Sequence, residues 1–270
     1  MGVPGISTVS RKLFGSRNDR MVKRYLKLVE QVSSREAETR LLTDAELYTK
    51  TADFRKRVSD GESATDLIPE VFAIAREAMD RAVGIRNIFN PLHEFDATLL
   101  TGDARKLYDE TKAIIDATED RNPDRELLGC VDPTPAWQFV EIPNALYEAV
   151  RELFPTSKPP FRARPFDVQL VGAVVLYEGR IAEMKTGEGK TIVAPLSCYL
   201  AAIENKQVHV VTVNDYLVQR DRDWTFPFFR SLGMTVGAIH PQHMQHPQLK
   251  QMAYHCDVVY GTTAEFGFDY

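Results

Sequence analysis

The sequence predicts an α/β protein in which a parallel sheet and its helices are built around a phosphate-binding loop. Three observations support this prediction. A Gly-rich stretch at residues 184–191 precedes apolar residues at helical spacing, three later apolar runs have the length of buried strands, and helical patterns separate those runs. The runs lie at 208–213, 235–239 and 257–262. Ahead of the loop, the apolar run 171–177 and the residues up to 184 predict a further strand.

The Gly-rich stretch contains the residue types that a phosphate-binding loop (P-loop) needs, in the order Met184, Lys185, Thr186, Gly187, Glu188, Gly189, Lys190 and Thr191. Glycines let successive backbone N–H groups face phosphate oxygens, a Lys supplies a positive charge, and a hydroxyl reaches Mg²⁺. The helix that follows adds its positive N-terminal end. Met184 departs from the usual Gly or Ala. An ordinary polar turn is the alternative, and the flanking strand and helix patterns argue against it.

Composition indicates a soluble globular protein of one or two domains. The chain has 270 residues, of which 44% are hydrophobic and 26% charged. We expect a cytosolic protein, because no apolar run is long enough to span a bilayer and the first ten residues do not resemble a signal peptide. Cys130, Cys198 and Cys256 are widely spaced and odd in number, which fits a reducing compartment. The net charge of −5 gives no basic footprint for nucleic acid.

Residues 1–86 are predicted to be helical. Basic side chains alternate with apolar ones between residues 11 and 28. Such a segment can lie on an anionic membrane, but the residues alone favour a helix packed on its own domain. Thr43 and Glu46 have the spacing of a capping box, so a helix should begin there. A second helix is predicted to have Pro69 at its first position.

Residues 87–164 have a different composition. This segment contains 8 of the 15 prolines and carries 9 basic and 14 acidic residues, so it accounts for the whole net charge of −5. Proline removes backbone donors and restricts its neighbours, which predicts short helices joined by extended links. The helices are expected at 104–117 and 145–154. No chemistry is indicated, and the aromatic residues Trp137 and Phe139 are more typical of local core than of a partner site.

Residues 165–270 contain the remaining candidate site residues. Gln169, in the string Phe166-Asp167-Val168-Gln169, has an amide that can both donate to and accept from adenine. The run 208–213 is expected to be a strand buried on both faces. It ends at Asn214 and Asp215, which can cap the next helix or meet a ligand at the strand end. Aromatic residues 224–229 are expected in the core.

Four histidines and a cysteine follow within a short distance of one another: His240, His243, His246, His255 and Cys256. Their spacing lacks the helical frame or closed four-ligand pattern that structural zinc uses. We therefore interpret this region as a polar loop.

These motifs together resemble the SecA family, the ATP-driven motors of bacterial preprotein translocation. The matching strings are 15–20, 67–70, 166–170, 182–191, 208–216, 260–262 and 265–270, which lie within residues 11–86 and 165–270. The resemblance implies a RecA-like fold, shared with superfamily-two helicases, in a chain divided into a helical region at 1–86, an insertion at 87–164 and a P-loop portion at 165–270.

The same resemblance implies roles and partners. Gln169 would recognise adenine, Thr186, Gly187, Glu188, Gly189 and Lys190 would hold the phosphates of ATP, and Thr191 would meet Mg²⁺ through its hydroxyl. The basic amphipathic segment would contact anionic phospholipid and the Sec translocon channel, with preproteins as the transported partners, and a homodimer is compatible with the family. Nucleic acid is not expected. The location implied is the cytoplasm and the inner face of the plasma membrane.

The insertion departs from the family, whose members run almost directly from the string at Gly84-Ile85-Arg86 into the Gln169 motif. The acidic motif that binds Mg²⁺ and activates water is implied to follow residue 270, so no complete catalytic set is expected within these residues. We therefore predict that residues 1–270 alone bind ATP with little hydrolysis. The alternatives are a helicase fragment and a non-hydrolysing module that binds nucleotide, lipid or channel.

Overall fold

A computed structural model describes residues 17–122 and 133–270. Residues 11–16 of the basic segment and Cys130 therefore lie outside the described residues. The α-helices are α2 (Arg17–Ser33), α3 (Glu36–Arg40), α4 (Asp44–Ser59), α5 (Ala64–Met79), α6 (Gly102–Ala117), α7 (Asn144–Leu153), α8 (Asp167–Tyr177), α9 (Lys190–Ala202), α10 (Asp215–Ser231), α11 (Pro247–Ala253) and α12 (Thr263–Asp269). Short 3₁₀ and π-helical turns join α5 to α6 and precede α7.

The sheet is parallel, as predicted, and has three strands among the described residues. These are β1 (Val208–Thr212), β2 (Val236–Ala238) and β3 (Val258–Thr262), in the order β1-β3-β2. Val258 of β3 lies opposite Val208 on one side and Val236 on the other. All of β3 is buried because it is the central strand.

Two sequence predictions about strands were wrong. The run 208–213 is not buried on both faces: β1 is at the edge of the described sheet, and Val211 is 56% exposed. Residues 171–177 form the second half of helix α8 rather than a strand, and residues 180–184 belong to no strand. A buried helix and a buried strand have the same continuous apolar composition, so the run could not distinguish them.

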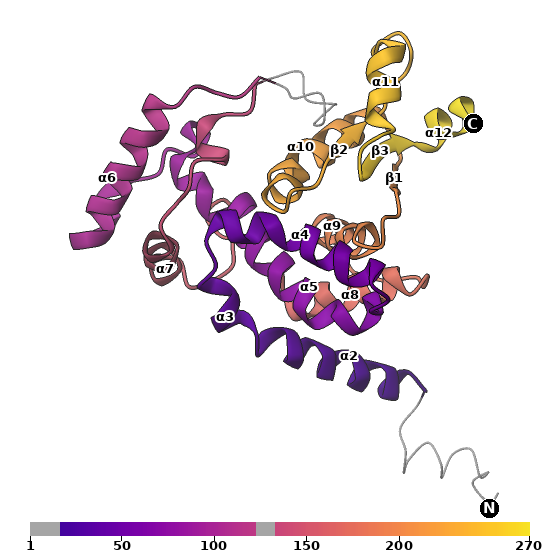
Figure 1. Cartoon of the computed structure of the whole chain (residues 1–270), viewed down its shortest axis with the longest axis horizontal. Helices are drawn as coiled ribbons and strands as arrows, with labels where there is room; N and C mark the ends of the chain where they lie inside the picture. The colour runs from indigo at the N-terminus through magenta and orange to yellow at the C-terminus, as the bar shows by residue number, and fades with distance from the viewer. Residues whose placement is uncertain (1–16, 123–132) are drawn as a thin grey trace, which may run out of the picture.

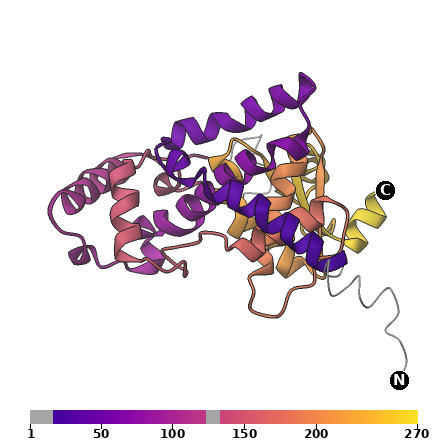
Figure 2. The same cartoon turned by 90° about the horizontal axis from the view of Figure 1, so that it is seen from below.

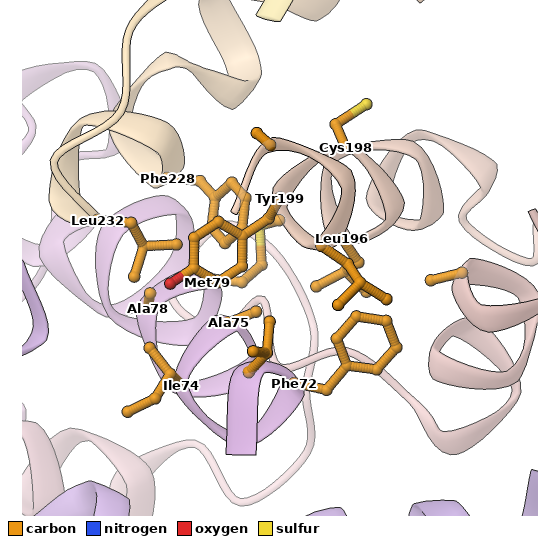
Figure 3. Close-up of a cluster of buried hydrophobic side chains, with 14 of the residues drawn as sticks. Phe72, Ile74, Ala75, Ala78, Met79, Leu196, Cys198, Tyr199, Phe228 and Leu232 are labelled. Carbon is orange, nitrogen blue, oxygen red and sulfur yellow. The ribbon is translucent and has the colours of Figure 1, made fainter. Parts of the chain in front are cut away.

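The main hydrophobic core lies where helix α5 meets α9 and α10. Figure 3 shows Phe72 and Met79 of α5 in one cluster with Tyr199 of α9 and Phe228 of α10, and each of these side chains is fully buried. The Tyr199 hydroxyl lies 3.1 Å from the Thr51 hydroxyl of α4. The prediction that residues 224–229 supply core is confirmed by Phe226, Phe228 and Phe229. The N-terminal helices and the P-loop region thus share one core.

The N-terminal helices follow their capping signals closely. The Glu46 N–H donates to the Thr43 hydroxyl and the Thr43 N–H donates to the Glu46 carboxylate, which completes the predicted capping box of α4. Helix α5, in contrast, begins five residues earlier than predicted. Ser63 caps it, so Pro69 lies inside the helix.

Helix α2 packs on α5 and α8, and it buries Tyr25, Val29 and Val32 (Figure 1). This packing confirms the interpretation that the sequence alone favoured for this segment. The Tyr25 hydroxyl donates to Glu178, 2.6 Å away, next to the end of α8. No helix in the described ranges 17–122 and 133–270 is long and apolar enough to cross a membrane.

The segment 87–164 forms its own layer around α6 and α7, to one side of the sheet (Figures 1 and 2). Both helices were predicted, and their apolar faces build a second core that includes Tyr108 and Tyr147. The segment leaves and rejoins the rest of the chain at one place. A Cβ added to Gly84 would lie 2.5 Å from the Ala163 nitrogen, so the two ends of the segment are in contact.

Candidate nucleotide-binding site

The P-loop connects helix α8 to helix α9. Gly187 and Gly189 have φ angles of 88° and 74°, a left-handed conformation that glycine adopts at little cost. Gly189 is also the N-cap of α9, whose 13 residues begin at Lys190. The loop therefore ends at the positive end of a helix, which is the arrangement that attracts phosphate.

Met184, the residue that departs from the usual loop pattern, has a structural reason. Its side chain packs against the main core, and its sulfur lies 3.4 Å from the position that a Cβ on Gly172 of α8 would take. Gly172 also lets α8 approach α9, since the same Cβ would be 3.2 Å from Val193. Met184 thus anchors the start of the loop where Gly or Ala could not fill the space.

Gln169 is 2% exposed and joins the N-terminus of α8 to the P-loop. Its side-chain oxygen accepts the Phe166 N–H at 2.8 Å, and its side-chain nitrogen donates to the Glu188 carbonyl at 3.0 Å. The structure therefore places Gln169 beside the loop, as the sequence indicated. These two contacts leave one donor hydrogen and one acceptor lone pair of the amide for a ligand, and recognition of adenine stays a prediction.

The side chains of Lys185, Thr186, Glu188 and Lys190 face solvent. The Lys190 ammonium is exposed and donates to the Lys185 carbonyl, 3.1 Å away. The Glu188 carboxylate accepts the Lys185 N–H at 2.7 Å. This contact shows that a backbone N–H of the loop binds an anionic oxygen. The Thr191 hydroxyl forms no hydrogen bond with any described residue, so it is available to a metal ion.

These observations fit a nucleoside triphosphate with Mg²⁺. A Cβ at Gly187 would meet nothing within 4 Å, so the space beside the loop backbone is open. The open backbone, the exposed Lys190 and the helix N-terminus lie together, and each favours negative charge.

Arg76 of α5 is a positioning residue that the sequence analysis missed. Its guanidinium is buried and donates to the Pro165 carbonyl at 3.0 Å and to the Asp167 carboxylate at 2.5 Å. Asp167 is the first residue of α8, so Arg76 holds the helix that carries Gln169. An Arg on the apolar face of a predicted helix was the available signal.

We expect Gly189→Ala to disrupt the loop. A Cβ at Gly189 would lie 2.3 Å from the Gln169 side-chain nitrogen, in addition to requiring a left-handed φ. The left-handed conformation alone costs about 1–2 kcal/mol. Thermal unfolding and nucleotide titration should show a loss of stability and of binding.

Gly179→Ala is the matched control, because Gly179 has a φ of 70° and a Cβ there would meet nothing within 4 Å. This variant should lower the free energy of unfolding only by the cost of the left-handed backbone conformation. It should leave nucleotide binding intact. Equal effects of the two variants on binding would contradict the role of the Gly189–Gln169 contact.

A second polar group of side chains lies at the carboxyl ends of the strands. Asn214 caps α10 by accepting the Leu217 N–H at 2.9 Å, which confirms its structural role. His240 follows β2, and its Nε2 lies 2.8 Å from the Gln219 side-chain oxygen. Burial lowers the pKa of His240, although the nearby Asp215 carboxylate opposes this shift. His240 is therefore held neutral at physiological pH.

The region from His240 to Cys256, predicted to be a polar loop, contains helix α11, so that prediction was wrong for residues 247–253. Among residues 17–122 and 133–270 there is no group of three or more His, Cys, Asp or Glu side chains that could hold a metal ion. His246 instead caps α11, where its Nδ1 accepts the Gln248 N–H at 3.3 Å. Cys256 is buried, and burial raises its pKa to about 11.

Comparison with known proteins identifies the family of this chain. The family model of the SecA DEAD-like domain matches residues 10–270. The chain is 37% identical to protein translocase subunit SecA of Nitrosomonas europaea over 265 residues, which is 98% of this chain and 20% of that protein. It is 37% identical over the same share to the subunit of Dechloromonas aromatica, and 36% identical over 260 residues to that of Thermosynechococcus vestitus. The chain spans about a fifth of the length of these relatives.

Proposed function

This chain belongs to the SecA family through its DEAD-like domain, and from that premise we propose that it binds ATP with Mg²⁺ as part of a preprotein-translocating motor. The observation that carries the proposal is the P-loop between α8 and α9, with two left-handed glycines, an exposed Lys190 and a helix N-terminus. Bound ATP supplies the free energy that such a motor converts into movement. The division into 1–86, 87–164 and 165–270 stays part of this proposal.

We assign the roles at the site from the geometry of each residue. The backbone N–H groups from Thr186 to Lys190 bind phosphate oxygens, because the backbone at Gly187 is accessible. The Lys190 ammonium exchanges the Lys185 carbonyl for phosphate. Thr191 provides its unpaired hydroxyl to Mg²⁺, and Gln169 offers its remaining donor and acceptor to adenine.

For residues 1–270 alone, we expect binding with little turnover. Phosphoryl transfer needs a positioned water and stabilisation of the charge that spreads over the phosphate oxygens. The Glu188 carboxylate of the loop is engaged by the Lys185 N–H. The family resemblance also implies that the water-activating acid belongs to a later motif.

A fluorescent ATP analogue tests the proposal. We expect saturable binding that weakens when Mg²⁺ is removed, together with phosphate release near the uncatalysed background. Saturable binding without any Mg²⁺ dependence would contradict the role of Thr191. Robust steady-state hydrolysis would show that these residues already contain a complete catalytic set.

The membrane partner is proposed from the outer face of α2. Val22 and Leu26 are 52% and 48% exposed, and the exposed Lys23 and Lys27 lie beside them. This face can lie on an anionic phospholipid surface near the translocon channel while the opposite face stays packed on α5 and α8. Peripheral attachment of a cytoplasmic protein would follow.

Charge reversal tests the membrane proposal. Each basic residue near an anionic surface contributes about 1 kcal/mol, so Lys23→Glu/Lys27→Glu should weaken co-sedimentation with anionic vesicles by at least about thirtyfold. Lys106→Glu/Lys112→Glu on α6 makes the same charge change at exposed positions and should have little effect. Equal losses in both double variants would reject α2 as the contact.

A further inference from the structure

A cavity of about 500 Å³ lies on the side of the molecule where the insertion meets the main domain. Its walls come from the start of α4, the end of α10 and the 3₁₀ turn Ala136–Gln138 with the neighbouring Phe139. None of its lining residues belongs to the P-loop. Its volume is within the range of small-molecule pockets.

Among the described residues that line this cavity are four arginines and two acids, Asp44 and Glu141. Arg86 pairs with Asp44 at 2.6 Å, and Arg81 pairs with Glu77 at 2.6 Å as well as with Asp44 at 3.1 Å. The Glu141 carboxylate accepts the Asp44 N–H at 3.0 Å. The cavity therefore has two further positive charges to be balanced.

Those charges belong to Arg121 and Arg230, whose guanidinium groups form no ion pair or hydrogen bond with any residue in the described ranges. Both lie against the Phe139 ring, with Cζ atoms 4.0 and 5.0 Å from its centroid. The ring attracts each cation but does not cancel their mutual repulsion. Burial, together with the positive charges of Arg121 and Arg86, lowers the pKa of Arg230 to about 10.

Backbone contacts fix this arrangement. The Arg121 N–H donates to the Thr134 carbonyl at 3.0 Å, and the Thr134 N–H donates back at 2.7 Å. The Asp120 carboxylate accepts the Ala136 N–H at 2.8 Å, which holds the turn that carries Gln138. Two backbone hydrogen bonds to Thr134 therefore hold the position of Arg121.

The amide of Gln138 is a second, independent sign of a ligand. Its side-chain oxygen is buried and has no hydrogen-bond partner among the described residues. An unpaired buried amide costs free energy that a bound polar group would recover. Rotation of the amide by 180° would present its NH₂ group to an anion at the same place.

We propose that this cavity binds a small molecule bearing a phosphate group. One phosphate carries about −1.5 to −2 charges at pH 7, which matches the two uncompensated guanidinium groups. Arginine forks bind phosphate oxygens in pairs, and Gln138 supplies the further polar contact. The remaining volume accommodates the rest of the ligand. The insertion provides Arg121 and Gln138, and the main domain provides Arg230. A bound ligand would therefore contact both the insertion and the main domain.

Pyrophosphate is the probe, and all proteins compared carry Lys190→Ala, which weakens phosphate binding at the P-loop equally in each of them. Calorimetric titration at low ionic strength should detect one pyrophosphate per chain. Arg121→Ala/Arg230→Ala should weaken this binding by at least about tenfold, the effect of losing charge-assisted hydrogen bonds. Arg230→Lys, which keeps the charge and loses the fork, should weaken it less.

Arg35→Ala/Lys106→Ala is the control, because it removes two positive charges at exposed positions outside the cavity. Unfolding curves establish that each variant is folded. Equal pyrophosphate affinity in the cavity and control variants, or no binding to the Lys190→Ala protein, would overturn the proposal. Tighter binding of citrate than of pyrophosphate would overturn the assignment to phosphate. These outcomes do not depend on nucleotide binding at the P-loop.

Discussion

Lys190→Ala should reduce the affinity for ATP by about 10- to 100-fold, as measured by titration of a fluorescent nucleotide. The Lys190 ammonium is exposed and holds only a loop carbonyl, so it is free to form charge-assisted hydrogen bonds with phosphate. Such bonds contribute about 1.5–3 kcal/mol each. The variant should keep the fold, because the side chain supports no part of the core.

Lys185→Ala is the appropriate control. Lys185 belongs to the same loop and is also exposed, but it precedes the two glycines and the start of α9. Its side chain should therefore contribute much less than that of Lys190. Equal binding by wild type and Lys190→Ala would refute the P-loop assignment, and equal losses in the two Lys variants would mean that general charge attraction, rather than this position, holds the nucleotide.

Asp80→Asn should lower the free energy of unfolding by about 3–5 kcal/mol, as measured by urea denaturation. Asp80 is 2% exposed, and its carboxylate accepts from the Arg162 guanidinium at 2.9 Å and from the Ala163 N–H at 3.0 Å. Arg151 lies 3.4 Å away. Burial alone would lower the pKa of Arg151, but the Glu77 and Asp80 carboxylates raise it above its ordinary value.

The large effect is expected because asparagine keeps the shape of the side chain but leaves buried arginines without their full compensating charge. Asp109→Asn tests this reasoning, since it removes an acid from the exposed Arg105 pair on α6. Solvent screens that pair, so the change in stability should be far smaller. Comparable losses in the two variants would show that the junction around Asp80 is not held by its buried charges.

The Asp80 junction lies close in the chain to residues that hold the helix of the candidate nucleotide site. Asp80 follows α5, and α5 also carries Arg76, which donates to the carboxylate of Asp167, the first residue of α8. Arg162 and Ala163 lie near the end of the insertion, and the Pro165 carbonyl also accepts from Arg76. The attachment of the insertion and the placement of the helix that carries Gln169 therefore depend on neighbouring residues at the end of α5 and within residues 162–167.

Much of the fold could be predicted from local patterns. The capping box at Thr43 and Glu46, the cap at Asn214 and the helices of the insertion depend on interactions within a few residues, so the sequence contains their full description. The strands at 236–238 and 258–262 were predicted because short apolar runs between helical patterns are typical of buried strands. The P-loop residues could also be proposed from the sequence, because loop chemistry is encoded in consecutive positions.

Other features could not be predicted because they depend on distant partners. Helix α8 was mistaken for a strand, since an apolar run reveals burial and not backbone conformation. The exposed edge of β1 follows from its place in the strand order. The hydrogen bond from Gln169 to the Glu188 carbonyl and the hydrogen bond from Arg76 to the Pro165 carbonyl join segments that are distant in the sequence. No local pattern could predict such contacts.

The sequence by itself indicated a P-loop and membership of the SecA family, because both depend on contiguous strings. Only the tertiary structure decided how the loop is held and where the insertion is attached. Buried charges such as Arg76 and Asp80 are stable only when their partners surround them, and all of those partners lie at least 40 residues away in the chain. The same reason explains why the arginine cavity beside Phe139 is visible only in the folded chain.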